Sequence, residues 1–478
     1  LDPGIGRAVE AAAAAWPARL SSTRLLGPAG FAALADNMLL MALLTSAPNT
    51  DIALERFLTM ARAALLGAAL PREITADDKT LRFAGAMAQQ CFINEFIFMA
   101  DETEIAEAKM LCETLAAALD SGEAIPPVQL LAGASYFPLM HLRGGERLLE
   151  RSWPPAVQEV LTRQLREPLE ERRLRAEIPR LTDIGSGTSQ LVQRQYEENP
   201  YPRWVRVAPA SRDNIVSFLS AKFPSARFER DPGRPMRDFL IAGCGTGQQS
   251  ILAAQKFGDG HMLAVDLSLS SLGYARRKSN ELGLKIAYGQ ADILELASLG
   301  RQFDVIECMG VLHHMADPYA GWKTLLALLR PNGFMEVGVY SAAARRPIHA
   351  VREEIAANGL GAADLRAFRQ GLMPSRDPGV QAAILKSEDF FTTSACRDLL
   401  FHVQEQGLTI GGIKAFLLEH GLAFLGFELD DAVVDAYRRR FRDDPAAVDL
   451  DHWAAFEADH PGMFAGMYRF WIWKSGQS

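Results

Sequence analysis

The chain has 478 residues, of which 49% are hydrophobic and 23% are charged, so it can bury the cores of two or three domains. Its net charge of -8 and its pI of about 5.7 lack the basic character of nucleic-acid-binding proteins, so we expect no nucleic-acid partner. The sequence contains no run of about 18 apolar residues, so we expect no membrane-spanning helix and no membrane partner.

The five cysteines are scattered, without a CxxC pair or a histidine-rich spacing of the kind that binds metal ions. Reduced thiols in a cytoplasmic protein explain this pattern, so we expect no bound metal and a cytoplasmic location. The chain starts at Leu1 rather than at a methionine, and we expect a longer protein with a segment upstream.

Residues 1–185 have the spacing of an all-α domain. Leu34, Met38 and Met41 recur at helical intervals, and residues 101–104 form a capping-box pattern that opens a helix through about Leu119. Such a domain could dock a partner, pair two copies of the chain into a homodimer, or cap a substrate.

A polar loop at residues 182–189 is the clearest domain boundary, and we assign residues 186–235 to a linker with a lid segment. From residue 236 to 478, short apolar runs alternate with helical stretches, which predicts an α/β fold around a mainly parallel sheet. Residues 341–408 are expected to form a helical insertion that caps the site. The expected strands are Asp238–Ala242, Met262–Val265, Lys285–Tyr288, Phe303–Glu307, Phe334–Tyr340, Leu422–Glu428 and Met467–Lys474.

The first of these strands ends in a glycine turn, Gly243-Cys244-Gly245-Thr246-Gly247, and a helix is expected to follow it. Glycines at such a turn let the backbone bend tightly and approach a ligand closely. Asp266 lies 23 residues after Gly243 and ends the second strand. An acid at that distance binds the ribose hydroxyls in nucleotide-binding βαβ units. Asp292, after the third strand, can accept a hydrogen bond from an adenine amino group.

Residues 237–340 resemble the class I S-adenosylmethionine-dependent methyltransferases, and most of all a subgroup around the ubiquinone-biosynthesis methyltransferases. The resemblance includes the run Leu329-Arg330-Pro331-Asn332-Gly333 before the fifth strand. It implies a Rossmann-like seven-stranded methyltransferase sheet, preceded here by the all-α domain, with S-adenosyl-L-methionine as cofactor. The residues implied are Gly243, Cys244, Gly245 and Gly247 at the methionine end, Asp266 and Leu267 at the ribose, Asp292 and Ile293 at the adenine, and Glu307 on the floor near the methionine end.

Two details of the sequence bear on which cofactor binds and how it is held. The glycines alternate strictly, whereas dinucleotide oxidoreductases use Gly-x-Gly-x-x-Gly, so we do not expect NAD to bind. The family often carries an acid two residues before the first glycine, where this chain has Ile241. A carboxylate near the amino group of the cofactor is therefore absent or replaced.

Methyl transfer needs in-line approach, a dry pocket and sometimes a base, so the candidate side chains are those near the carboxyl ends of the strands. Residues 196–204, called here the aromatic segment, combine two prolines with aromatic rings, as a lid over cofactor and substrate would. The remaining candidates lie after the fourth and fifth strands and in the insertion. We assign catalytic roles to His313, Tyr201 and Tyr340, and substrate or lid roles to Tyr196, Asn199, Tyr201, Trp204, Arg397 and His402.

The full chain also resembles bacterial proteins in which such a methyltransferase is joined to tetratricopeptide repeats. The stretches that carry this likeness are residues 88–95, 199–204, 397–405 and 467–474. Three functions follow as hypotheses. The chain methylates O, N or C of a small molecule; or it methylates a protein docked by the helical domain; or it binds S-adenosylmethionine as a non-catalytic scaffold, which the missing acid at Ile241 allows.

Overall fold

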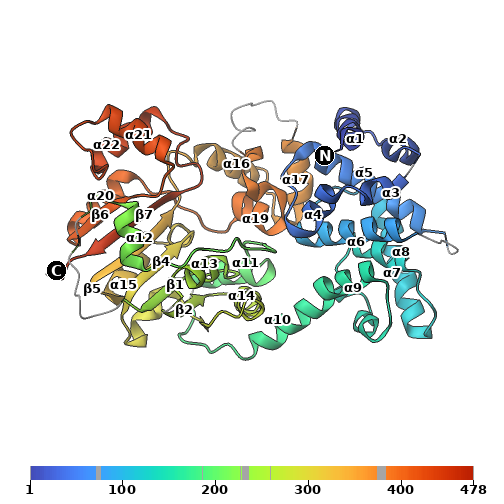
Figure 1. Ribbon diagram of the computed structural model, residues 1–478, viewed down its shortest axis with the longest axis horizontal. Helices are drawn as coiled ribbons and strands as arrows, with labels where there is room; N and C mark the ends of the chain where they lie inside the picture. The colour runs from blue at the N-terminus through green and yellow to red at the C-terminus, as the bar shows by residue number, and fades with distance from the viewer. Residues whose placement is uncertain are drawn as a thin grey trace. The chain divides into compact units, whose positions relative to one another are not determined.

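A computed structural model describes residues 2–28, 30–71, 77–185, 187–226, 228, 236–258, 260–373 and 384–476 (Figure 1). The chain divides into two compact units. The first comprises Leu1–Glu170, Arg203–Arg206 and Ala357–Phe401, and the second comprises Glu171–Pro202, Val207–Ala356 and His402–Ser478.

The first unit is helical throughout its described residues, as the sequence predicts for the amino-terminal part. The predicted cap at Asp101 is confirmed, since its carboxylate accepts a hydrogen bond of 2.8 Å from the backbone N–H of Glu104. Its helices are α1 (Pro3–Ala15), α2 (Ser22–Leu26), α3 (Gly30–Ala35), α4 (Met38–Ser46), α5 (Ile52–Ala69), α6 (Asp78–Ile93), α7 (Glu102–Ser121), α8 (Pro127–Ala134), η1 (Leu139–His141), η2 (Gly145–Glu150), α9 (Pro155–Leu161), η3 (Thr162–Arg166), η6 (Ala362–Asp364), α17 (Leu365–Leu372), η7 (Glu388–Phe391) and α19 (Thr393–Phe401).

Among the described residues, no single helix is both long and apolar enough to cross a membrane, and only the bent pair Ser22–Ala35 and Met38–Ser46 passes that test when its parts are joined.

Residues 357–401 belong to the first unit by their contacts, although the sequence places them in an insertion of the second domain. Two interactions explain this. The guanidinium of Arg369 on α17 binds both carboxylate oxygens of Glu55 on α5 at 2.7 Å, and both side chains are buried. The backbone N–H of Ser394 on α19 donates to the carboxylate of Glu95, which follows α6. Buried charge pairs and hydrogen bonds thus join this distant stretch to the amino-terminal helices.

The second unit contains a seven-stranded sheet, which confirms the predicted fold class (Figure 1). Its strand order is β3-β2-β1-β4-β5-β7-β6, in which β1 to β5 run parallel and β7 pairs antiparallel with both neighbours. The seven expected strands are all present, with ends shifted by a few residues at most positions. They are β1 (Asp238–Ala242), β2 (His261–Asp266), β3 (Ile286–Gln290), β4 (Phe303–Met309), β5 (Leu329–Val339), β6 (Leu422–Phe427) and β7 (Tyr468–Lys474).

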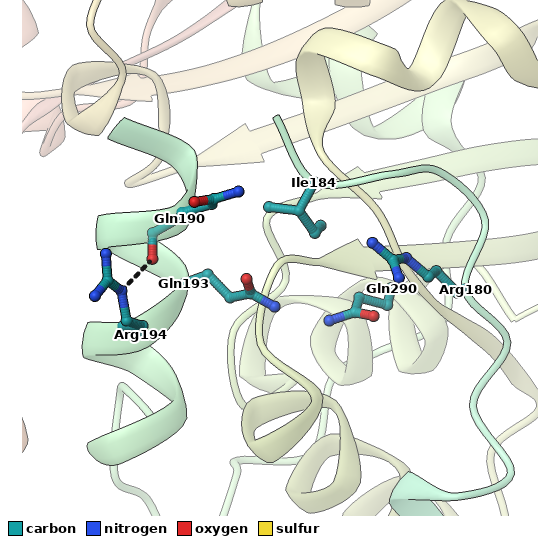
Figure 2. A pocket seen from close by; sticks show the side chains of 6 residues that line it. All are labelled: Arg180, Ile184, Gln190, Gln193, Arg194 and Gln290. Carbon is teal, nitrogen blue, oxygen red and sulfur yellow. Dashed lines mark hydrogen bonds between the residues drawn. The ribbon is translucent and has the colours of Figure 1, made fainter. Parts of the chain in front are cut away.

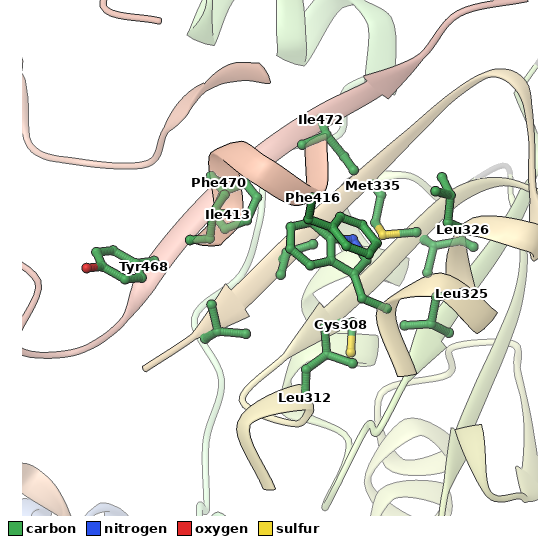
Figure 3. Close-up of a cluster of buried hydrophobic side chains, with 14 of the residues drawn as sticks. Cys308, Leu312, Leu325, Leu326, Met335, Ile413, Phe416, Tyr468, Phe470 and Ile472 are labelled. Carbon is green, nitrogen blue, oxygen red and sulfur yellow. The ribbon is translucent and has the colours of Figure 1, made fainter. Parts of the chain in front are cut away.

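Helices cover both faces of this sheet, as apolar strands without alternation require. On one face, Phe416 lies over the strands and stacks on Trp322 with ring centroids 4.1 Å apart (Figure 3). The other face is covered by apolar side chains of α12, α13 and α14. The helices of this unit are α11 (Thr188–Glu198), α12 (Ile215–Lys222), α13 (Gln248–Lys256), α14 (Leu269–Glu281), η4 (Ile293–Leu299), η5 (Leu312–His314), α15 (Pro318–Leu328), α20 (Ile410–Glu419), α21 (Asp431–Arg440) and α22 (Leu450–Asp459), and the chain crosses between units within α10 (Glu167–Arg175) and α16 (Arg346–Ala357).

The residues just before the loop that the sequence marks as a domain boundary pack on the sheet of the second unit. Leu181 donates its backbone N–H to the carbonyl of Gln290 at 2.8 Å, and Gln290 donates to the carbonyl of Pro179 at 2.9 Å. A short stretch of chain is thereby added beside the edge strand β3. The contacts place the change of unit at Glu170, before this loop, and residues 179–181 satisfy exposed backbone groups of the edge strand β3.

Candidate cofactor-binding site

The glycine turn lies at the carboxyl end of β1, directly before α13. Gly243, Gly245 and Gly247 all have positive φ, of 74°, 51° and 87°. A Cβ atom on Gly245 would lie 2.6 Å from the carbonyl oxygen of Tyr201, and one on Gly247 would lie 2.5 Å from Cβ of Ala275. These positions need glycine both for their backbone conformation and for the close approach of neighbouring chain.

The turn is held against the neighbouring strand by its own backbone. Gly243 and Cys244 both donate N–H groups to the carbonyl of Val265 on β2, at 2.8 and 2.9 Å. Cys244 is buried, and burial raises the pKa of its thiol well above the usual range, so this cysteine is a packing residue in the thiol form.

Asp266 ends β2 and joins the second strand to the turn. One carboxylate oxygen accepts the N–H of Gly245 at 2.8 Å, and the other accepts the N–H of Ser268 at 2.9 Å. The side chain is only half-buried, and each oxygen can accept a further hydrogen bond. These acceptor oxygens therefore fit a ligand with two neighbouring hydroxyl groups that donate, as the ribose of S-adenosylmethionine has.

A cavity of about 330 Å³ opens beside the residue that follows Asp266. Its walls are tied to Leu267, whose carbonyl accepts hydrogen bonds from the side-chain amides of Gln290 at 2.9 Å and Gln193 at 3.3 Å. In Figure 2, Gln193 and Gln290 approach the cavity from opposite walls, with Ile184 between them. The lining residues are Arg180, Ile184, Gln190, Gln193, Arg194 and Gln290.

Asp292 begins η4 and is buried. One carboxylate oxygen accepts the N–H of Leu294 at 3.1 Å, and the other accepts the N–H of Gly185 at 3.1 Å. Its backbone N–H donates to the hydroxyl of Thr182 at 2.9 Å. The loop before α11 thus reaches the position where the sequence predicts an adenine contact, and Ile293, also buried, packs in the core beneath it.

The aromatic segment begins on α11 and runs to the glycine turn. The carbonyl of Tyr196 accepts a hydrogen bond from the hydroxyl of Ser268 at 3.0 Å, just after Asp266. Further on, the carbonyl of Tyr201 accepts the N–H of Thr246 at 3.3 Å, and the carbonyl of Pro202 accepts its hydroxyl at 2.5 Å. Residues 196–202 therefore lie along the carboxyl edge of β1 and β2. Asn199, half-buried, ends α11 within this stretch.

Five ring side chains form a cluster near the carboxyl ends of β4 and β5: Tyr196, His313, His314, Tyr340 and His402. The hydroxyl of Tyr196 lies 3.2 Å from Nε2 of His402, whose ring stacks on His314 at a centroid distance of 3.7 Å. The backbone N–H of Gln404 donates to Nδ1 of His402 at 3.0 Å. The proton of the neutral ring is therefore on Nε2, which donates to the oxygen of Tyr196.

His313 and Tyr340 form the inner part of this cluster. The two rings stack with centroids 3.8 Å apart, and Nδ1 of His313 accepts the backbone N–H of Tyr340 at 3.2 Å. His313 is fully buried, and this burial, with smaller effects from His314 and Arg345, holds its pKa well below the usual range. The imidazole is thus neutral.

The predicted site residues divide between the two units. Trp204 and Arg397 are in the first unit. The second unit holds the glycines, the acids of the strand ends, Tyr196, Tyr201, His313, Tyr340 and His402. Two residues that line the cavity, Gln193 and Gln290, were not singled out from the sequence. Nothing in their local pattern marks them, because their shared acceptor, the carbonyl of Leu267, is brought to them only by folding.

In the ribose-binding role expected for Asp266, cofactor binding depends on pH. Burial raises the pKa of Asp266 to about 6, with the nearby Glu197 adding to the shift and the backbone N–H groups opposing it. Only the carboxylate can accept two ribose hydroxyls, so we expect S-adenosylmethionine affinity to be full above pH 7 and to fall as the pH drops through 6. The limit is about tenfold per pH unit. Calorimetry at pH 5, 6 and 7 measures this, and Asp266→Asn should give a flat profile between pH 5 and 7.

Comparison with known proteins agrees with this geometry. Residues 239–333 match a family described as methyltransferase domain. The chain is 30% identical over 208 residues to the protein syc1184_c of Synechococcus sp., covering 41% of this chain and 49% of that protein. It is 35% identical over 100 residues to a ubiquinone biosynthesis O-methyltransferase of Bordetella avium, covering 21% of this chain and 41% of that enzyme.

Among solved structures, PKMT2 from Rickettsia typhi aligns with a TM-score of 0.40 and 17% sequence identity, covering 55% of this chain and 52% of that one. The chain spans less than half the length of the curated relatives it matches. The matched segment includes the glycine turn, Asp266 and Asp292 within the sheet of the second unit. The second unit therefore carries a class I S-adenosylmethionine-dependent methyltransferase domain, with S-adenosyl-L-methionine as its cofactor.

Proposed function

We propose that the chain transfers a methyl group from S-adenosylmethionine to an oxygen, nitrogen or carbon atom of a small molecule. The observation that carries this proposal is the hydrogen bond between Asp266 and Gly245, which joins the expected ribose acid to the glycine turn at one edge of the sheet. The names of two matched groups of relatives support a small acceptor: ubiquinone biosynthesis O-methyltransferase and phosphoethanolamine N-methyltransferase.

In this proposal the cofactor lies along the carboxyl ends of β1, β2 and β3. When bound, S-adenosylmethionine supplies a methyl group on a positively charged sulfur. Asp266 and Leu267 border the ribose, and Asp292 and Ile293 border the adenine, near the cavity of Figure 2. The turn residues Gly243, Cys244, Gly245 and Gly247 border the methionine end.

The aromatic segment is the lid in this proposal. Its backbone already hydrogen-bonds to the glycine turn through Thr246, which supports a place over the cofactor. Aromatic faces attract a sulfonium by about 0.5–2 kcal/mol when water is excluded. The prolines at 200 and 202 reduce the entropy that is lost when the segment is ordered.

In this proposal, the side chains that surround the acceptor are those of Tyr196, His313, His314, Tyr340 and His402. His402 donates to the oxygen of Tyr196, and we assign this pair of side chains to positioning the acceptor. His313 is poorly placed to accept a proton from the acceptor, because its ring is fully buried against Tyr340. We keep Tyr201 and Tyr340 as side chains that position the acceptor.

Labelled methyl donor tests the proposal directly. The chain is incubated with S-adenosylmethionine labelled on the methyl group and with cell extract, and the products are separated into protein and small-molecule fractions. We expect label in the small-molecule fraction, and none with Asp266→Ala. Label in the protein fraction alone would identify a protein methyltransferase instead. Label in neither fraction, with the cofactor bound, would identify a non-catalytic scaffold.

A further inference from the structure

The acid that is missing from β1 has a counterpart on the neighbouring strand. Ile241 stands where related methyltransferases often carry a carboxylate, and in the sheet its register partner on β4 is Glu307. Glu307 follows Val305 by two residues on β4, so the two side chains lie on the same face of the sheet. Val305 packs in the same apolar cluster as Ile241. The carboxylate of Glu307 is therefore on the face of the sheet, and at the level, where an acid at position 241 would be.

Glu307 is 2% exposed, so it reaches a ligand only through another group. That group is Gln249, the second residue of α13, whose side-chain Nε2 donates to the Glu307 carboxylate at 2.6 Å. Gln249 is half-buried and follows the glycine turn by two residues. Because its amide N–H is bound to the carboxylate, its carbonyl oxygen is turned away from Glu307 and is an acceptor for a cation.

Several charged groups surround Glu307, of which Glu336 is buried and Arg469 is partly exposed. Glu336 is its register partner on β5, and Arg469 on β7 pairs with Glu336 and with Glu428 at 3.1 Å. The positive charge of Lys256, on α13, attracts the Glu307 carboxylate and so opposes the rise in its pKa. Burial raises the pKa of Glu307, and it raises that of Glu336 to about 8. Buried carboxylates are usually paired, and Glu307 is hydrogen-bonded by the Gln249 amide and attracted by Arg469 and Lys256.

We propose that Glu307, acting through the amide of Gln249, replaces on β4 the carboxylate that is missing at Ile241, and so selects the ammonium group of the methionine end of the cofactor. This inference rests on the proposed function. Glu307 is a positioning residue, since it orients the amide, and Gln249 is the residue that contacts the ligand.

Two ligands that differ only at the methionine end test the inference. S-adenosylhomocysteine carries the amino-acid group, and 5′-methylthioadenosine lacks it. In calorimetry, Glu307→Leu should weaken S-adenosylhomocysteine about tenfold or more, because a hydrogen bond to a charged group is lost, and should leave 5′-methylthioadenosine within about twofold. A merely structural role would weaken both ligands alike, and that result, or no change in either, would overturn the inference.

A rescue variant separates the carboxylate from its position. Ile241→Asp in the Glu307→Leu background returns an acid to β1, and it should restore the affinity for S-adenosylhomocysteine without changing that for 5′-methylthioadenosine. Failure of the rescue by a folded double variant would count against the inference.

Gln249→Leu provides a second route if Glu307→Leu does not fold, because residue 249 is half-buried and at a helix start. It should show the same selective loss, and Glu307→Leu combined with it should lose no more than either change alone. Additive losses would contradict action through the amide. If the unaltered chain binds neither ligand, the proposed function itself fails. If the unaltered chain binds both ligands and neither Glu307→Leu nor Gln249→Leu changes the affinities, only this inference is refuted.

Discussion

Replacing Asp266 with alanine is expected to weaken S-adenosylmethionine binding by about 1–3 kcal/mol, which corresponds to about 5- to 150-fold in Kd. Asp266 is the acceptor for the ribose hydroxyls in our proposal, and it also holds the N–H of Gly245 at 2.8 Å. The change therefore removes a ligand contact and loosens the turn that borders the methionine end. Calorimetry with S-adenosylmethionine and S-adenosylhomocysteine measures the loss.

The matched control for this variant is Asp238→Ala. Asp238 begins β1 at the amino end of the sheet, where it pairs with Arg330 at 2.7 Å, far along the strand from the glycine turn. This variant should keep its affinity for both ligands even where its melting temperature falls. NAD should not bind to the unaltered chain. Tight NAD binding, together with an Asp266→Ala variant that binds S-adenosylmethionine normally, would show that the cofactor site is assigned incorrectly.

Replacing Arg369 with alanine is expected to lower the free energy of unfolding of the first unit by about 3–5 kcal/mol. Arg369 is fully buried, binds both oxygens of Glu55 at 2.7 Å, and donates through Nε to the carbonyl of Phe390 at 2.7 Å. Its removal leaves the Glu55 carboxylate and a carbonyl buried without these donors. Denaturant unfolding, followed by circular dichroism, should show an earlier first transition.

Two variants show whether the loss comes from the unpaired charge. Arg369→Met combined with Glu55→Leu removes both charges at similar volume and should recover most of the stability. Lys79→Ala breaks an exposed ion pair with Asp36, and its effect should stay below about 1 kcal/mol. If Arg369→Ala is no worse than Lys79→Ala, the joining of residues 357–401 to α5 by this pair is contradicted.

Much of the second unit could be predicted from local pattern, because a strand buried on both faces is a short apolar run and a tight turn at its end needs glycine. The run before Gly243 and the acid at Asp266 identify β1 and β2 without any knowledge of distant contacts, and the resemblance of residues 237–340 to a known family indicates the cofactor class. The cap at Asp101 is equally local, since it depends on a side chain three residues from its partner. These features depend on neighbours in the sequence, and the sequence alone determined them.

Other features depend on residues that meet only after folding. The stretch 357–401 has the helical pattern of an insertion, yet the partner of Arg369 is Glu55, 314 residues away, and no periodicity reveals such a pairing. The neighbour of Ile241 is visible as Glu307 only once β4 lies beside β1 in a definite register. The sequence by itself therefore determined the sheet, the glycine turn and the cofactor. Tertiary structure alone decided which unit holds residues 357–401 and that Glu307 is buried opposite Ile241, because register and burial arise from contacts between distant parts of the chain.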